Sequence, residues 1–155
     1  VQDELLHGGT LTDSQRLELL ATLDFFRGLR EADLRAVLKA ASWRAWGDGE
    51  TIIEEGEEDR ALHVLAQGEV TVSRSGREIA TLQAGECFGE MAYLGGGRRS
   101  ATVAAMGPAL VLRIEEPLKK WASLPVQMEL GQRLQETLIR RLEQTTRRLA
   151  HALKG

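Results

Sequence analysis

Glycine residues at regular intervals constrain the fold of this chain more than any other feature of its sequence. They stand at positions 47, 49, 56, 68, 76 and 85, mostly seven to twelve residues apart. The apolar segments between and after them are centred on residues 52–53, 62–64, 70–72, 79–82, 102–103 and 110–112. Short strands separated by such turns are typical of an antiparallel sandwich or barrel rather than of a parallel sheet. We therefore expect a mainly β fold over residues 42–114.

The turn residues within this region predict how its strands connect. Ser75-Gly76 stands between apolar segments 70–73 and 78–82 and has the composition of a hairpin tip. Antiparallel strands that leave few free edges favour a double-stranded β-helix, that is, a jelly-roll-like β-roll.

Helical patterns flank the predicted β-roll. Thr12, with Gln15 three residues later, has capping-box spacing and predicts the start of a helix. An apolar stripe predicts a second helix over residues 31–41, and a short helix is expected over 118–122. The fold class is therefore a β-roll with N-terminal helices and a long C-terminal helix.

The C-terminal helix is expected over residues 126–153, and its last part has a coiled-coil pattern. Apolar or small residues alternate spacings of four and three at Leu138, Leu142, Thr145, Leu149 and Ala152. Such a face needs a partner, which is the β-roll, a second copy of the helix, or both.

We divide the 155 residues into three parts. Residues 1–11 have no clear periodicity and are expected to be a linker or a disordered arm. Residues 12–125 hold the N-terminal helices and the β-roll, and residues 126–155 form the C-terminal helix. The chain begins with Val1 rather than Met, so we expect it to be a piece of a longer polypeptide.

Composition excludes several classes of function. The net charge of −3 provides no overall basic field for nucleic acid or a lipid surface. No apolar run approaches the ~20 residues of a membrane helix. Cys87 is the only cysteine, which indicates a reducing compartment and hence the cytoplasm, and we interpret it as a small buried apolar residue.

A candidate binding site lies in two nearby segments. Its residues are Phe88, Gly89, Glu90, Met91, Ala92, Arg99, Ser100, Ala101 and Thr102. A carboxylate such as that of Glu90 accepts hydrogen bonds from sugar hydroxyls, and the planar, permanently charged guanidinium of Arg99 matches phosphate oxygens. Backbone N–H groups at the predicted helix start over 90–92 also favour an anion. Taken singly, Glu90 is equally compatible with a carboxylate that only complements a helix dipole, and Arg99 with a surface loop.

The sequence gives no sign of catalysis or of a metal site. No nucleophile stands with a base and an orienting group, so we do not expect an enzyme. The acidic run over residues 54–59 has no calcium-loop spacing and is interpreted as a solvated turn. His7, His63 and His151 are scattered, and we predict no metal.

With these segments inside a β-roll, the chain resembles the cyclic-nucleotide-binding domain family over nearly its whole length after residue 12. The first half of the resemblance is carried by residues 49–59 and by Gly68-Glu69-Val70, and the second half by 88–92 and 99–103. The resemblance implies that Gly89 and Glu90 hold the ribose, with Glu90 on the 2′-hydroxyl. It also implies that Arg99 and Ser100 hold the cyclic phosphate, assisted by the backbone of residues 91–92.

The C-terminal helix looks like that of the bacterial catabolite activator branch. Arg140-Arg141-Leu142 and Thr145-Thr146 match its dimer helix, where two hydroxyl residues meet the adenine amine. Thr145 is also compatible with a hydroxyl that bonds back to the Arg141 carbonyl. The DNA-reading domain of that branch has no counterpart in this chain, so no nucleic acid is expected as its partner.

The resemblance implies a regulatory module that binds a cyclic purine nucleotide. Ser100 is the residue of the cAMP-binding branch, so cAMP is the expected ligand, with cGMP as the other possibility. Binding is expected to be transmitted through the C-terminal helix to a homodimer partner or to a fused effector such as an enzyme, channel or transporter. The alternative is a degenerate family member that is only a dimerisation or protein-interaction module.

Overall fold

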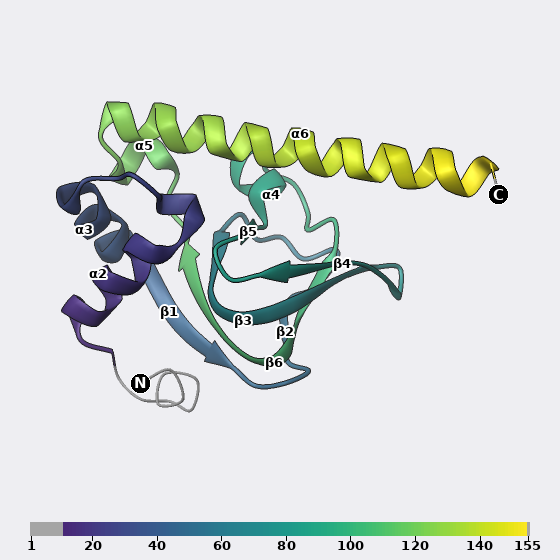
Figure 1. Ribbon diagram of the computed structural model, residues 1–155, viewed down its shortest axis with the longest axis horizontal. Helices are drawn as coiled ribbons and strands as arrows, with labels where there is room; N and C mark the ends of the chain where they lie inside the picture. Colours follow the sequence, from purple (N-terminus) through teal and green to yellow (C-terminus); the bar gives the residue numbers. More distant parts are fainter. Residues whose placement is uncertain (1–10, 155) are drawn as a thin grey trace.

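The computed structural model describes residues 11–154, which form a curved antiparallel sheet with helices at one end and along one side (Figure 1). Helices α2 (Asp13–Thr22) and α3 (Glu31–Ala40) flank the 3-10 turn η1 (Asp24–Phe26). The predicted arm over 1–11 lies outside the described residues except for Leu11, which is buried in the core.

Both N-terminal helices form where the sequence predicts them. The capping box at the start of α2 is present: the Gln15 N–H donates to Thr12 Oγ1 at 3.2 Å, and the Thr12 N–H donates to Gln15 Oε1 at 2.9 Å. These two bonds satisfy donors that a helix start leaves free. The capping box thus fixes the entry of the chain into the domain.

Six strands form one antiparallel sheet. They are β1 (Ala41–Trp46), β2 (Thr51–Ile53), β3 (Leu62–Arg74), β4 (Arg77–Gln83), β5 (Cys87–Phe88) and β6 (Thr102–Ile114). The order is β1-β6-β3-β4, with β2 paired to β6 and β5 paired to β3. A mainly β fold with flanking helices is therefore confirmed.

The division of the chain into strands differs from the prediction, because two pairs of apolar segments are each one long strand. Segments 62–64 and 70–72 both belong to β3, and segments 102–103 and 110–112 both belong to β6. Gly68 has a φ of +89°, and a Cβ there would lie 2.3 Å from the Pro108 carbonyl oxygen. The β3–β6 register shifts on both sides of Gln67. Gly68 thus marks an irregularity within a strand, not the turn we predicted.

The predicted hairpin is present between β3 and β4. Ser75 and Gly76 both have positive φ, 52° and 79°. Two successive positive φ values are the requirement of a type I′ turn, whose twist suits antiparallel strands.

Apolar side chains form two clusters on opposite faces of the sheet. The first lies beneath the helices and includes Phe26, Val37 and Leu112. The second lies inside the curve of the strands and includes Leu65, Phe88 and Val111. The alternation of side chains along β3 and β6 produces this division.

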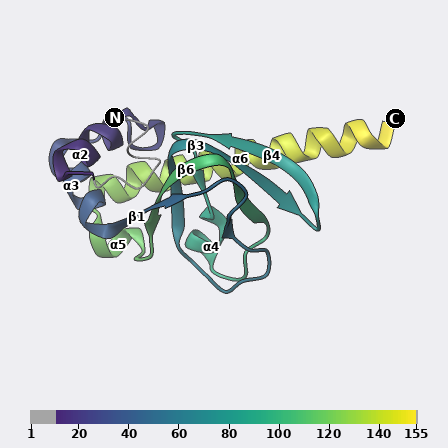
Figure 2. The ribbon, with the colours of Figure 1, turned by 90° about the horizontal axis from the view of Figure 1, so that it is seen from below.

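Helix α5 (Leu118–Trp121) leads into the long helix α6 (Leu124–Lys154). The first half of α6 is anchored by Val126, Leu130 and Leu134, which are buried in the first cluster. Its second half passes α4 and β4, and the last turns extend beyond the sheet in both views (Figures 1 and 2). Leu142 and Leu149 on this half are 67% and 60% exposed, so part of the predicted coiled-coil face is not covered by the β-roll.

Candidate functional site

The short helix α4 (Glu90–Gly95) forms the centre of the predicted site. It begins after Gly89, whose φ of +78° lies in the left-handed region. A Cβ at Gly89 would lie 2.5 Å from Arg99 Nη1 and 3.0 Å from the Ala61 carbonyl oxygen. The absence of a side chain at residue 89 therefore creates the space that Arg99 occupies.

Arg99 is 4% exposed and is held by backbone and side-chain acceptors. Its Nη2 donates to the Ala61 carbonyl at 2.8 Å, and its Nη1 donates to the Gly89 carbonyl at 3.2 Å. Nη2 also lies 3.0 Å from Asp59 Oδ2. Its Nε atom is buried and has no hydrogen-bond partner among residues 11–154.

Asp59 is the exception to our interpretation of the acidic run as a solvated turn, since residues 54–58 are exposed. Its side chain is 23% exposed and pairs with both Arg99 and Arg113. Arg113 donates Nη1 and Nη2 to the two carboxylate oxygens at 2.8 and 3.0 Å. Burial alone would raise the pKa of Asp59, but hydrogen bonds from Arg113, the Ala61 N–H and Arg99 outweigh it and hold that pKa far below its ordinary value. Sequence reasoning missed this residue, because nothing local links position 59 to position 99.

Glu90 is 6% exposed, and its partner comes from α6. Arg141 Nη1 donates to Glu90 Oε1 at 2.5 Å, and Arg141 Nη2 donates to the Cys87 carbonyl at 2.6 Å. The long helix is therefore bonded directly to the first residue of α4. We did not predict Arg141 as a site residue, although the Arg140-Arg141-Leu142 match was its signal.

The other predicted residues of the two segments have different environments. Phe88 is buried, with its ring stacked on His63 at 5.1 Å between centroids. Ser100 and Met91 are exposed, and Ser100 Oγ lies 3.9 Å from Met91 Sδ. Ala92 is buried, Ala101 and Thr102 are half-buried, and Thr102 Oγ1 accepts from the Glu55 N–H at 3.0 Å. The structure thus brings residues 88–92 and 99–102 together.

Thr145 and Thr146 are exposed on α6. The Thr145 hydroxyl donates to the Arg141 carbonyl at 2.9 Å. This is the bond back to the helix that we considered beside a contact with the adenine amine. A hydroxyl that donates one bond keeps two acceptor positions, so this bond does not preclude a ligand contact. Further along α6, Arg148 bonds to the Ile79 carbonyl of β4.

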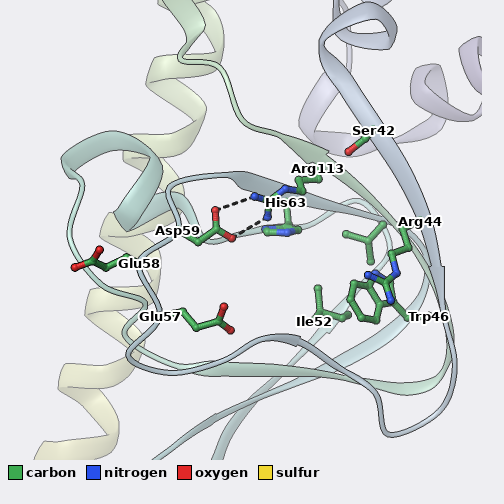
Figure 3. A pocket seen from close by; sticks show the side chains of 10 residues that line it. Ser42, Arg44, Trp46, Ile52, Glu57, Glu58, Asp59, His63 and Arg113 are labelled. Atoms are coloured by element: carbon green, nitrogen blue, oxygen red, sulfur yellow. Dashed lines mark hydrogen bonds and ion pairs between the residues drawn. The ribbon is translucent and has the colours of Figure 1, made fainter.

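A separate cavity of about 470 Å³ opens on the inner face of β1, β3 and β6 (Figure 3). Its lining residues are Ser42, Arg44, Trp46, Ile52, Glu57, Glu58, Asp59, His63, Val111 and Arg113. None of the predicted site residues is among them. Burial first, and then the charges of Arg99 and Arg113, lower the pKa of His63 to about 3.

Three general properties of residues 11–154 complete the description. Burial raises the pKa of the Cys87 thiol to about 12, which agrees with a structural cysteine. Within these residues no three His, Cys, Asp or Glu side chains come together as a metal site would require. No helix in this part of the chain combines the length and apolarity that crossing a membrane demands.

Known proteins share the fold, and a family model spans both segments of this site. Residues 43–118 match the family model of the cyclic nucleotide-binding domain. A cGMP-dependent protein kinase of Eimeria tenella is 34% identical over 68% of this chain, which covers 10% of the kinase. The chain thus spans about a tenth of that relative.

Two solved structures extend the comparison. The regulatory domain of Toxoplasma gondii PKA with cAMP has a TM-score of 0.67 at 25% identity, over 79% of this chain and 49% of that one. The catabolite activator protein of Thermus thermophilus has a TM-score of 0.69 at 28% identity, over 82% of this chain and 62% of that one. These likenesses confirm the predicted β-roll. Through residues 43–118 the chain belongs to the cyclic nucleotide-binding domain family.

Proposed function

We propose that this chain is a non-catalytic regulatory module that binds a cyclic purine nucleotide, with cAMP as the expected ligand. The observation that carries the proposal is the juxtaposition of Glu90 and Arg99 around Gly89. Both side chains are buried and hydrogen-bonded, so their orientation is fixed before a ligand arrives. Preorganisation of this kind lowers the cost of binding.

The chemistry of the two side chains assigns the ends of the ligand. The charged guanidinium of Arg99 is suited to the oxygens of the cyclic phosphate, and Ser100, the next residue in the sequence, is exposed. Arg141 bonds to one carboxylate oxygen of Glu90, and the carboxylate retains acceptor capacity for the ribose 2′-hydroxyl. Met91 and Ala92 lie in the first turn of α4, beside these groups.

The bond between Glu90 and Arg141 supplies the route by which binding reaches α6. A ligand that bonds to Glu90 changes the environment of Arg141, and hence the free energy of keeping α6 against the β-roll. Because a ligand shifts an equilibrium only by its differential affinity for two states, the position of α6 must affect nucleotide affinity as well.

The hydrogen bond of Thr145 supports cAMP over cGMP. Since its hydroxyl donates to the Arg141 carbonyl, it is left to act as an acceptor. The exocyclic amine of adenine is a donor, whereas the carbonyl of guanine is an acceptor. If Thr145 or the neighbouring Thr146 contacts the base, adenine is the better match. The relatives include both cGMP-dependent kinases and a cAMP-bound PKA domain, so cGMP is the alternative.

Calorimetric titration of nucleotide-stripped protein with cAMP and cGMP tests the proposal. We expect micromolar or tighter binding of cAMP. Arg99→Lys keeps a charge beside Asp59 but loses the planar fork, and it should weaken binding at least tenfold. Arg98→Lys is the matched control, because Arg98 is exposed and pairs with Glu58 at 2.9 Å. Folded protein that gives no heat with either nucleotide would refute the proposal.

The exposed apolar residues of α6 support a homodimer as the form that transmits the signal, with a fused effector domain as the other recipient. Ile139, Leu142, Leu149 and Leu153 on the second half of α6 are 58–80% exposed. The same residues favour the alternative function, a dimerisation module that binds no nucleotide. Calorimetry and light scattering on the same protein separate the two functions together, because a dimerisation module alone gives a dimer but no heat with either nucleotide.

A further inference from the structure

We propose that the cavity on the inner face of β1, β3 and β6 binds a zwitterionic α-amino acid with an apolar side chain. This site is distinct from the one formed by residues 88–92 and 99–102, because neither Glu90 nor Arg99 lines it. Its volume of about 470 Å³ falls within the range of small-molecule sites. The inference does not depend on nucleotide binding.

The charges that line the cavity define the class of ligand. Asp59 is neutralised by Arg113 at 2.8 Å, and Glu58 pairs with Arg98 at 2.9 Å. Arg44 and Glu57 remain, and in the described part of the chain neither takes part in an ion pair. One cation and one anion therefore remain for a ligand that carries both charges.

These two groups lie on different sides of the cavity. Figure 3 shows Glu57 on the side of the 57–59 turn, and Arg44 beside Trp46 across the cavity. The Arg44 guanidinium lies 3.7 Å from the centroid of the Trp46 ring, which orients it by stacking. Glu57 Oε1 accepts from the Glu54 N–H at 2.9 Å. This bond fixes the carboxylate, and its second oxygen can accept a hydrogen bond from a ligand. The α-carboxylate of the ligand would accept hydrogen bonds from Arg44, and its ammonium would donate to Glu57.

The rest of the lining suits an apolar side chain with a polar neighbour. Ile52, Val111 and Trp46 supply apolar surface. His63, which is 3% exposed, is the buried polar residue of the lining.

Three probes of the same size test the proposal on the unmodified protein. L-Phenylalanine carries both charges, 3-phenylpropionate lacks the ammonium, and phenethylamine lacks the carboxylate. Titrations are followed by the indole N–H resonance of Trp46, assigned with Trp46→Phe. We expect saturable binding of L-phenylalanine, and binding of each analogue to be roughly tenfold weaker, the usual effect of losing a charged hydrogen bond.

Charge-removing variants provide the second readout. Arg44→Gln and Glu57→Gln should each weaken L-phenylalanine binding roughly tenfold, and the amide oxygen introduced by Glu57→Gln can still accept from the Glu54 N–H. Arg35→Gln and Glu31→Gln are the matched controls, since this 3.0 Å pair lies on α3 and not in the cavity lining. Any one of three results would overturn the proposal. They are the lack of saturable binding of L-phenylalanine, equally tight binding of 3-phenylpropionate, and unchanged L-phenylalanine binding in both cavity variants.

Discussion

At Gly89 two constraints coincide, a φ of +78° and an arginine nitrogen 2.5 Å from the place of a Cβ. We expect Gly89→Ala to lower the free energy of unfolding by about 1–3 kcal/mol, because the left-handed backbone is strained for alanine and Arg99 must move. Displacement of Arg99 should also weaken cAMP binding. Urea unfolding and calorimetry measure the two effects.

Gly95→Ala is the control for this substitution. Gly95 is the last residue of α4, it has no positive φ, and a Cβ there meets nothing within 4 Å. Its replacement should leave both stability and affinity nearly unchanged. Equal effects of the two substitutions would show that neither the positive φ of Gly89 nor the space it leaves for Arg99 contributes to stability and affinity.

His63 makes stability depend on pH. Its pKa is about 3 in the folded protein, against about 6.5 in an unfolded chain, so between these values only the unfolded chain binds the proton. Stability therefore falls as the pH falls through this window, by up to about 1.4 kcal/mol per pH unit.

Urea unfolding at pH values between about 5 and 7.5 measures this dependence, in a range above the titration of ordinary carboxyl groups. In His63→Leu the decline below about pH 6 should be shallower, because the buried imidazole is gone. An identical slope in wild type and His63→Leu would contradict the assignment.

Single residues also show where sequence reasoning stops. Gly89, Glu90 and Arg99 could be predicted because they lie within a short, ordered motif. Asp59 could not, since its role depends on two arginines that only the folded sheet brings to it. An acidic run is usually solvated, and the pattern around residue 59 contains nothing that distinguishes it.

Among the elements, those with local signals were predicted well. The α2 capping box and the Ser75-Gly76 turn each depend on residues adjacent in the sequence, and both are confirmed. The continuity of β3 through Gly68 was not predicted, because a glycine at an irregularity and a glycine in a turn look alike. The close approach of Pro108 distinguishes them, and that contact joins residues far apart in the sequence.

Helix α6 is bonded to α4 through one side chain, that of Arg141. Arg141→Gln removes the ion pair with Glu90 and the bond to the Cys87 carbonyl. We expect faster hydrogen exchange in the second half of α6, and cAMP affinity roughly tenfold lower, since bonds to a charged group contribute about 1.5–3 kcal/mol. Hydrogen exchange with mass-spectrometric detection and calorimetry measure these changes.

Arg140→Gln is the matched control for Arg141. The two arginines are neighbours on α6, but Arg140 is exposed and does not bond to Glu90. Its replacement should change neither measurement. If Arg141→Gln behaves like Arg140→Gln, the ion pair does not hold α6 against the β-roll.

For the whole molecule, we propose that the exposed apolar residues on the second half of α6 determine the oligomeric state. We expect a dimer in light scattering, because Leu142 and Leu149 are 67% and 60% exposed at positions that a second helix can cover. The double variant Leu142→Asp, Leu149→Asp should be a monomer. Gln144→Asp, on the opposite face of the helix, should remain a dimer. A wild-type monomer at all concentrations would contradict the proposed interface.

The central claim is that cAMP occupies the cassette formed by residues 88–92 and 99–102, and amide chemical-shift mapping during titration tests it most directly. We predict that shifts concentrate at these residues and around Arg141, and saturate with the calorimetric affinity. Shifts confined to the cavity beside Arg44 and Trp46, or none at saturating cAMP, would contradict the account.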